Sequence, residues 1–182
     1  GHLCTNNGAV WNFNGLVFDG VDDYVRLPLT NTLDFTSQSF SLIVWIKLTG
    51  GDATKTIYNR GTYQVAGYRW TISSTNRVTI ATYQNLTDQN SNSVPITTNV
   101  WTHVAVVRSN ASCRCYTDGR DSTETVGTHI NPVSSSSISP DIGGITTGNS
   151  FGGSIAQVLI YNRAPNADEI HRLYESTKWR FK

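Results

Sequence analysis

Three carboxylates, Asp19, Asp22 and Asp23, lie close together in the segment LVFDGVDDYVRL at residues 16–27. Oxygen-rich clusters can bind calcium, paired carboxylates can perform acid–base chemistry, and Asp and Gly residues also form polar turns. A turn between two strands is sufficient to explain these residues, because Gly20 and the two following aspartates tolerate turn geometry. Calcium needs about six oxygens, so other groups would have to complete its ligands. A structural Ca²⁺ at these aspartates is therefore an alternative to a plain turn.

The segment GNSFG at residues 148–152 matches the G-x-S-x-G pattern of a nucleophilic serine. In enzymes this motif lies between a buried strand and a helix. A strand-like segment follows here, and neither His103 nor His129 has a carboxylate partner that the sequence can place. We therefore interpret the motif as a glycine-rich loop. The four histidines also lack the spacing of a zinc site.

The composition limits the partners. The chain has 182 residues, which fits one domain, and its net charge of +1 with 15% charged residues provides no basic stripe for nucleic acid. No apolar run reaches the roughly 18 residues of a membrane span, so membrane insertion is not expected. The three cysteines are too few for a disulfide framework, although a bridge from Cys4 to Cys113 or Cys115 stays open. Glycosylation-type tripeptides at Asn85 and Asn110 favour an extracellular protein.

Apolar residues recur at every second position in short segments separated by Gly, Asn, Asp and Ser, which is typical of an antiparallel sandwich. The segments at 39–48 and 100–109 are apolar on both faces, so we expect both to be covered on two sides. Shorter strands are expected at 56–61, 68–73 and 77–84, and Asp118-Gly119 predicts a tight hairpin turn.

Two further segments complete the outline. The serine-rich stretch at 131–140 predicts an exposed loop. Residues 164–175 predict the one convincing helix, with Asn166 and Glu169 able to form a capping box. We assign Trp45, Trp70 and Trp101 to the core.

Five segments taken in order resemble the laminin-G-like, or concanavalin A-like, jelly rolls of a lectin and glucanase superfamily. They are LVFDGVDDYVRLP, SFSLIVWIKL, NVWTHVAVVRS followed by YTDGR, FGGSIAQVLIYNRA, and ADEIHRLY. The resemblance implies an all-β, two-sheet antiparallel sandwich with one concave sheet and one short C-terminal helix. We expect a single domain over 1–182, with its core at about 16–174, cut from or processed out of a larger protein.

Departures from the family concern the chemistry. Relatives often carry an acidic residue in the final strand, where this chain has Ala156 and Gln157, so a carboxylate that could join a cation site is missing. Glycosidases on this scaffold place paired carboxylates along one strand. The three glutamates of this chain, Glu124, Glu169 and Glu175, cannot supply such a pair, so we expect no enzyme activity.

Aromatic and amide side chains at residues 58–90 are the best lead for binding, because sugars pack their C–H faces on aromatic rings and bond polar groups nearby. For Tyr63 and Tyr83, binding and plain surface exposure are both open readings. The candidate ligand residues are Tyr58, Asn59, Arg60, Tyr63, Tyr68, Tyr83, Asn85 and Asp88.

The sequence thus predicts a non-catalytic recognition module, extracellular or exposed on a cell surface or virion, beside neighbouring domains of a larger chain. Its expected partners are glycans, bound through the concave face or the rim loops. The alternative is a structural or adhesive domain of a surface layer, virion or fibre that binds a protein surface.

Overall fold

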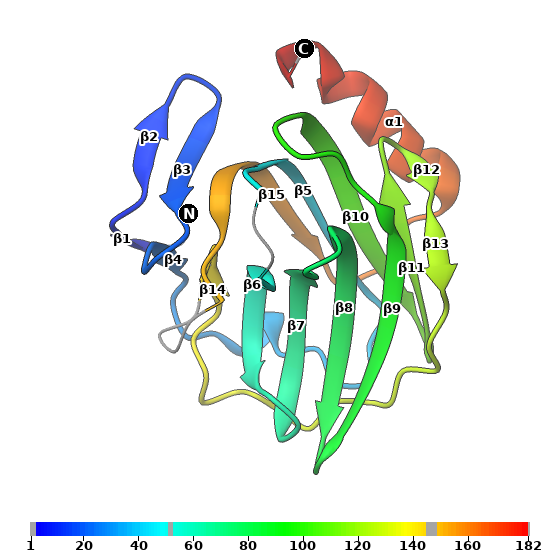
Figure 1. Cartoon of the computed structure of the whole chain (residues 1–182). Helices are drawn as coiled ribbons and strands as arrows, with labels where there is room; N and C mark the ends of the chain where they lie inside the picture. The colour runs from blue at the N-terminus through cyan, green and yellow to red at the C-terminus, as the bar shows by residue number, and fades with distance from the viewer. Residues whose placement is uncertain (1–2, 51–52, 145–148, 182) are drawn as a thin grey trace.

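The computed structural model describes residues 3–50, 53–144 and 149–181, without the side chains of residues 87–89. Two antiparallel sheets are stacked face to face as a jelly-roll sandwich (Figure 1). The eight-stranded sheet contains, in spatial order, β1 (Thr5–Asn7), β4 (Tyr24–Arg26), β14 (Asp141–Ile142), β6 (Lys55–Thr62), β7 (Ala66–Ile72), β8 (Arg77–Gln84), β9 (Thr87–Pro95) and β13 (Thr123–Thr125). The seven-stranded sheet contains β12 (Arg120–Asp121), β11 (Ser112–Thr117), β10 (Trp101–Ser109), β5 (Phe40–Leu48), β15 (Gly152–Tyr161), β3 (Gly15–Asp19) and β2 (Val10–Asn12).

The helices are short. They are η1 (Asn31–Leu33), α1 (Ala167–Thr177) and η2 (Lys178–Phe181). This architecture confirms the predicted two-sheet antiparallel sandwich with one short C-terminal helix. Within the described ranges, no helix combines the length and the apolar character needed to cross a membrane.

Strand β5 is apolar on both faces because each face packs against a different layer. Phe40, Val44 and Leu48 lie on the face that meets the eight-stranded sheet, in the main core. Ile43 and Trp45 lie on the opposite face, in two smaller clusters. Strand β10 repeats the arrangement, so the expectation that both strands are covered on two sides is confirmed.

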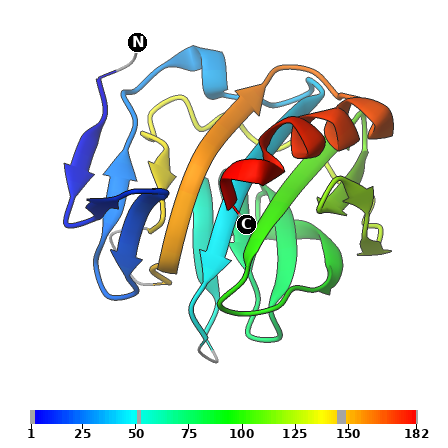
Figure 2. The same cartoon turned by 90° about the horizontal axis from the view of Figure 1, so that it is seen from above.

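Helix α1 covers the outer face of the seven-stranded sheet (Figure 2). It begins with the predicted capping box, in which Asn166 accepts from the Glu169 amide and Glu169 accepts from the Asn166 amide. Ile170 is fully buried against Ile43 and Tyr116 of the sheet. The eight-stranded sheet carries no helix of the described chain on its outer side, and we call that side the open face.

The tryptophans largely follow the prediction. Trp70 and Trp45 are buried, at 0% and 3% exposed. Trp101 is only partly buried and packs against Phe181, with the ring centroids 4.9 Å apart.

No disulfide forms among the described cysteines. Cys113 and Cys115 are fully buried in the main core, whereas Cys4 is exposed, so a bridge from Cys4 to either is excluded in this fold. Burial raises the pKa of both core thiols to about 12, which keeps them protonated.

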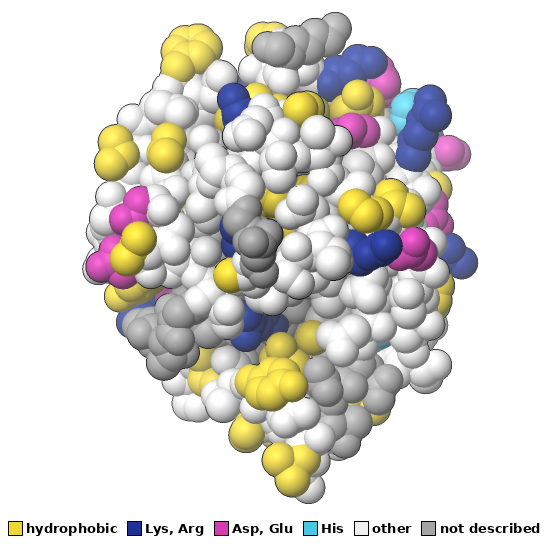
Figure 3. Space-filling view, viewed as in Figure 1, with side chains coloured by type: hydrophobic (Ala, Val, Ile, Leu, Met, Phe, Trp, Pro, Cys, Tyr) yellow, Lys and Arg dark blue, Asp and Glu magenta, His cyan; other side chains and the backbone are white. Residues whose placement is uncertain are grey.

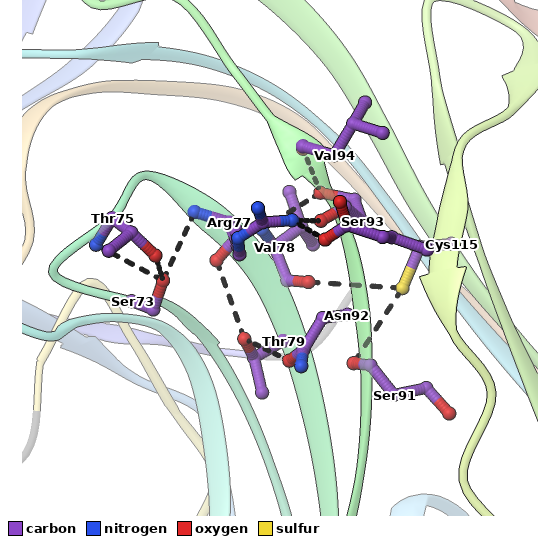
Figure 4. Close-up of polar contacts among 11 residues, drawn as sticks. Ser73, Thr75, Arg77, Val78, Thr79, Ser91, Asn92, Ser93, Val94 and Cys115 are labelled. Carbon is purple, nitrogen blue, oxygen red and sulfur yellow. Dashed lines mark hydrogen bonds and ion pairs between the residues drawn. The ribbon is translucent and has the colours of Figure 1, made fainter.

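Polar contacts fix the register of β8 and β9 where their pairing is irregular (Figure 4). The Val78 amide donates to Ser93 Oγ at 3.0 Å, and Thr79 Oγ1 donates to Asn92 Oδ1 at 2.8 Å. The Cys115 thiol reaches across from the other sheet to the carbonyl oxygen of Val78, at 3.9 Å. These contacts hold the part of the open face that β8 and β9 form.

Candidate functional site

One row of side chains crosses the open face of the eight-stranded sheet. Residues paired across neighbouring strands point to the same side of a sheet, so the pairings identify the members of the row. From β4 to β9 the row consists of Arg26, Asp141, Asn59, Arg69, Ala81 and Asn90. Polar groups from segments far apart in the sequence therefore converge on one surface.

A hollow of about 720 Å³ lies over this row. Figure 3 shows the face as mainly uncharged polar surface, with basic side chains set back in its centre. The hollow is lined by Arg26, Asn59, Gly61, Thr62, Tyr63, Arg69, Ser137, Ile138, Ser139, Asp141 and Asn149. A smaller hollow of about 230 Å³ shares Tyr63, Arg69 and Asn149 with it and extends over β8 and β9.

Asp141 and Arg26 form a fixed ion pair in the hollow. Arg26 Nε and Nη2 donate to the two carboxylate oxygens of Asp141 at 2.8 and 2.9 Å. The hydrogen bonds to Asp141 raise the pKa of Arg26, and the Asp141 side chain is nearly buried. Both groups are therefore held rigidly, with their charges largely satisfied by each other.

Arg69 lies in the centre of the row and has a neutral partner. With the Asn149 amide oriented to satisfy both of its polar atoms, the Asn149 oxygen accepts from Arg69 Nη2 at 2.9 Å. The Asn149 nitrogen then donates to the Thr54 carbonyl at 3.2 Å. Asn149 thus fixes the guanidinium from the side of the hollow.

Tyr63 provides the aromatic surface of the hollow. Its side chain is 60% exposed, and its ring meets the ring of Tyr83 edge to face, with centroids 5.6 Å apart. Tyr83 is only 3% exposed. The exposed ring of Tyr63 can therefore contact a ligand. Tyr83 is buried and packs against the Tyr63 ring.

For Tyr58, Arg60 and Tyr68 the prediction of ligand contact is wrong. Their side chains are 1%, 0% and 0% exposed and point into the sandwich. The pairings of Tyr58 with Trp70 and of Arg60 with Tyr68 place all three on the core face of β6 and β7. In β6 the alternation of polar and aromatic residues does not identify the inner face. In β7 it does, because Tyr68 shares a face with Trp70, so the core assignment of Trp70 places Tyr68 inward as well.

Arg60 has a structural role instead. Arg60 Nε donates to Ser135 Oγ at 3.3 Å, and Ser135 in turn donates to Asp34 through its amide and hydroxyl. Burial opposes ionisation of Asp34, but the hydrogen bonds from Ser134 and Ser135 outweigh it and lower its pKa. This network anchors the 131–140 loop. The sequence predicts only an exposed loop there, whereas the loop in fact forms one wall of the hollow.

The remaining predicted ligand residues divide. Asn59 lines the hollow, and its contact with a ligand stays a prediction. Asn85 is exposed in the β8–β9 turn but lines neither hollow. Asp88 pairs with Tyr83 through its backbone, and its side chain lies outside the described residues.

The aspartate cluster folds as a turn that binds its own backbone. The Asp19 amide donates to Asp23 Oδ2 at 2.8 Å, and the Val21 amide donates to Asp19 Oδ1 at 2.7 Å. Oxygens of Asp19, Asp22 and Asp23 lie within 4.8 Å of one another, which supplies three of the about six ligands that calcium needs. Turn chemistry accounts for the hydrogen bonds that are present.

The serine motif has no nucleophile geometry in its described part. Ser150 Oγ donates to the Val21 carbonyl at 2.8 Å and leads into strand β15, while Gly148 lies outside the described residues. The His129 ring nitrogens lie 3.0 and 2.9 Å from the hydroxyls of Thr82 and Ser91, so this buried histidine has its polar partners within the fold.

Of the charged and amide side chains that line the hollow, sequence reasoning missed four: Arg26, Arg69, Asp141 and Asn149. A signal existed for Arg69, because placing Trp70 inside the core places its neighbour Arg69 on the open face. No such signal existed for Arg26 and Asp141, which are 115 positions apart in the chain.

A hollow of about 410 Å³ lies beside the β2–β3 hairpin. Apolar side chains such as Leu16, Ile155 and Val158 line much of it, and the Asn12 side-chain oxygen is occupied by the amides of Asn14 and Gly15. Fewer oriented polar groups converge here than on the open face.

Comparison with known proteins places this architecture in a family. A family model described as the concanavalin A-like lectin/glucanases superfamily, of laminin G type, matches residues 19–171. A search of curated protein sequences gives no significant match.

The chain is similar in structure to the botulinum neurotoxin serotype G binding domain, with a TM-score of 0.77, 15% identity, and coverage of 97% of this chain and 47% of that one. A structure of botulinum neurotoxin type C, whose cell entry depends upon interaction with two ganglioside molecules, is similar with a TM-score of 0.72 and 15% identity. The match covers 97% of this chain and 46% of that one. A Trypanosoma rangeli sialidase in complex with difluorosialic acid is similar with a TM-score of 0.70 and 17% identity, over 97% of this chain and 30% of that one. The chain thus spans less than half the length of these structures. With the family match extending over most of its length, the chain belongs to the concanavalin A-like lectin/glucanase superfamily.

Proposed function

We propose that this domain is a non-catalytic module that binds glycans in the hollow of the open face. The observation that carries the proposal is the exposed ring of Tyr63 beside the fixed polar groups of Asn59 and Asn149. Sugars need an aromatic surface for their C–H faces and oriented donors and acceptors for their hydroxyls. Asn59 lies on strand β6, Tyr63 packs against Tyr83, and Asn149 is hydrogen-bonded to Arg69, so these groups are positioned before a ligand arrives. This limits the entropy lost on binding.

The similar structures support this proposal. Two belong to neurotoxins, one of them a binding domain and the other from a toxin that depends on two ganglioside molecules for cell entry. A non-catalytic role is supported by the acidic groups of the hollow, since Asp141 is the one carboxylate among its described lining residues and is already paired with Arg26. Glycoside hydrolysis by the usual route uses two carboxyl groups across the scissile bond.

The test is a glycan array followed by calorimetric titration of the best ligands. Tyr63→Ala should weaken binding by about 10-fold or more, because it removes the exposed aromatic face. Trp179→Ala is the matched control, since Trp179 is 70% exposed but lies on η2, in the layer of α1. An array without any bound glycan, or equal losses for the two variants, would contradict the proposal.

The titrations of Tyr63→Ala and Trp179→Ala should each be run once with calcium and once with a chelator. We keep a structural calcium ion at Asp19, Asp22 and Asp23 as a separate proposal, and Asp22→Asn tests it through the calcium dependence of the melting temperature. The two readouts are independent, because the aspartate turn lines neither of the two hollows of the open face.

We also propose that the domain works outside the cell or at a cell or virion surface, as one part of a larger chain. A single shallow hollow provides modest affinity, so attachment to further domains or to an oligomer would supply avidity.

The alternative is a structural or adhesive domain that binds a protein surface. It is favoured by the exposed apolar side chains of the β2–β3 hairpin, where Val10, Trp11 and Phe13 are 65%, 74% and 102% exposed. Light scattering discriminates the two, because self-association that Phe13→Ser abolishes would favour the structural role.

A further inference from the structure

We propose that the hollow selects glycans that carry a carboxylate, and that Arg69 is the residue that pairs with this group. The inference rests on the proposed function, because it names the class of glycan for the same hollow. It makes Arg69 the determinant of specificity, with Tyr63 and Asn59 contributing to the binding of acidic and neutral sugars alike.

The position of Arg69 is central. It lies opposite Asn59 on one neighbouring strand and opposite Ala81 on the other, and it lines both the larger and the smaller hollow. Ala81 has no side chain beyond Cβ, so the strand beside Arg69 leaves space above it. A ligand in either hollow would therefore meet the guanidinium.

The charge of Arg69 is not balanced by the described part of the protein. The ion pairs found there all involve other cations, and no described carboxylate lies within 4.0 Å of the Arg69 guanidinium. Its hydrogen-bond partner is the neutral amide of Asn149, and its Nε is shielded from solvent without a partner. A guanidinium that lines a hollow and has no carboxylate partner of its own can pair with an acidic group of a ligand bound there.

The other charges of the hollow leave an excess of one positive charge. Arg26 and Asp141 cancel each other through their two-fold hydrogen bond, and Arg69 remains. The planar fork of an arginine can bind a planar carboxylate through two parallel hydrogen bonds. We therefore assign the acidic group to a carboxylate, as in sialic and uronic acids.

The first experiment needs no variant. The whole chain is titrated by calorimetry with sialyllactose and with lactose, and then with a methyl glucuronide and a sulfated N-acetylglucosamine. The two carboxylated sugars should bind about 10-fold or more tightly than the neutral one, because a charge-assisted pair adds this much. The preference should fall as sodium chloride is raised, since salt screens the pair.

The second experiment assigns the preference to one residue. Arg69→Gln should remove the preference, so that sialyllactose and lactose bind this variant with similar affinity. Arg69→Lys should keep part of it, because the charge remains while the planar fork is lost. Arg172→Gln is the matched control, since Arg172 is exposed on α1 in the other layer, and it should keep the full preference. Circular dichroism and melting temperature establish that each variant is folded.

The outcomes separate the inference from the proposed function. Equal binding of acidic and neutral sugars, or a preference that survives in Arg69→Gln, would overturn the inference and leave glycan binding intact. A preference for the sulfated sugar over both carboxylated ones would also overturn the assignment. Failure of every sugar on the array to bind would overturn both.

Discussion

Arg108 brings a charged side chain into the space between the sheets, where it is fully shielded from solvent. Desolvation lowers the pKa of Arg108, yet arginine remains protonated in proteins. Its Nη1 donates to the carbonyls of Thr36 and Gln38 at 2.8 and 3.0 Å, and its Nη2 donates to Asn131 Oδ1 at 2.7 Å. One side chain therefore ties the segment before β5 to the loop that leads to the wall of the hollow.

Arg108→Met should lower the free energy of unfolding by roughly 3 kcal/mol, because the buried carbonyls that it leaves lose charge-assisted hydrogen bonds. Urea denaturation followed by tryptophan fluorescence measures the loss. Arg172→Met is the control, since Arg172 is exposed on α1 and should change stability by less than about 0.5 kcal/mol. Equal stabilities of the two variants would show that the Arg108 network does not stabilise the fold.

The β11–β12 turn shows how one element positions another. Asp118 and Gly119 both have positive φ, at 49° and 74°, as a tight two-residue hairpin requires. A Cβ on Gly119 would lie 2.9 Å from Cβ of Tyr174 and 3.1 Å from Nδ1 of His171, so α1 packs directly on this turn. Glycine is needed here for its backbone conformation and also for its lack of a side chain.

Gly119→Ala should therefore destabilise the domain by roughly 2 kcal/mol, combining a strained left-handed conformation with a close contact against the helix. The measurement is the midpoint of urea unfolding. Gly50→Ala is the matched control, because a Cβ there meets nothing within 4 Å. If both variants unfolded at the same urea concentration, the close packing of α1 on the turn would be refuted.

Elements with a one-sided or two-sided apolar pattern could be predicted from the sequence. The faces of β5 and β10, the Asp118-Gly119 turn and the Asn166–Glu169 capping box all follow from local chemistry and are found as expected. The site could be predicted only in part. Alternation does not fix which side of β6 faces inward when Tyr58 and Arg60 are both polar enough for either side, and the register of the completed sheet places both in the core.

The whole molecule determines the rest of the site. Arg26 and Asp141 meet because β4 and β14 become neighbours in the completed sheet, a contact between distant segments that no local pattern encodes. The outer side of the eight-stranded sheet is left open because α1 packs on the seven-stranded sheet instead (Figure 2). Both facts belong to the topology, so the lining of the hollow could not be read from any single segment.

Stability as a function of pH is also a property of the whole molecule. His103 and His129 are each 2% exposed, and desolvation lowers the pKa of both from 6.5 to about 4. Between these values the unfolded chain binds protons at both positions and the folded protein does not. Stability contributed by the neutral histidines is therefore complete above pH 6.5 and is lost as the pH falls towards 4.

The expected loss is on the order of 3 kcal/mol for each histidine over this window, since each pKa unit corresponds to about 1.4 kcal/mol. Urea midpoints measured from about pH 7 to about pH 4.5 should fall steadily, with a slope equivalent to the uptake of about two protons on unfolding.

His129→Gln should reduce this slope by about one proton, whatever it does to the stability at neutral pH. A slope that was the same in the wild type and in His129→Gln would mean that His129 is protonated within the folded protein. The hydroxyls of Thr82 and Ser91 would then both have to act as acceptors toward its ring.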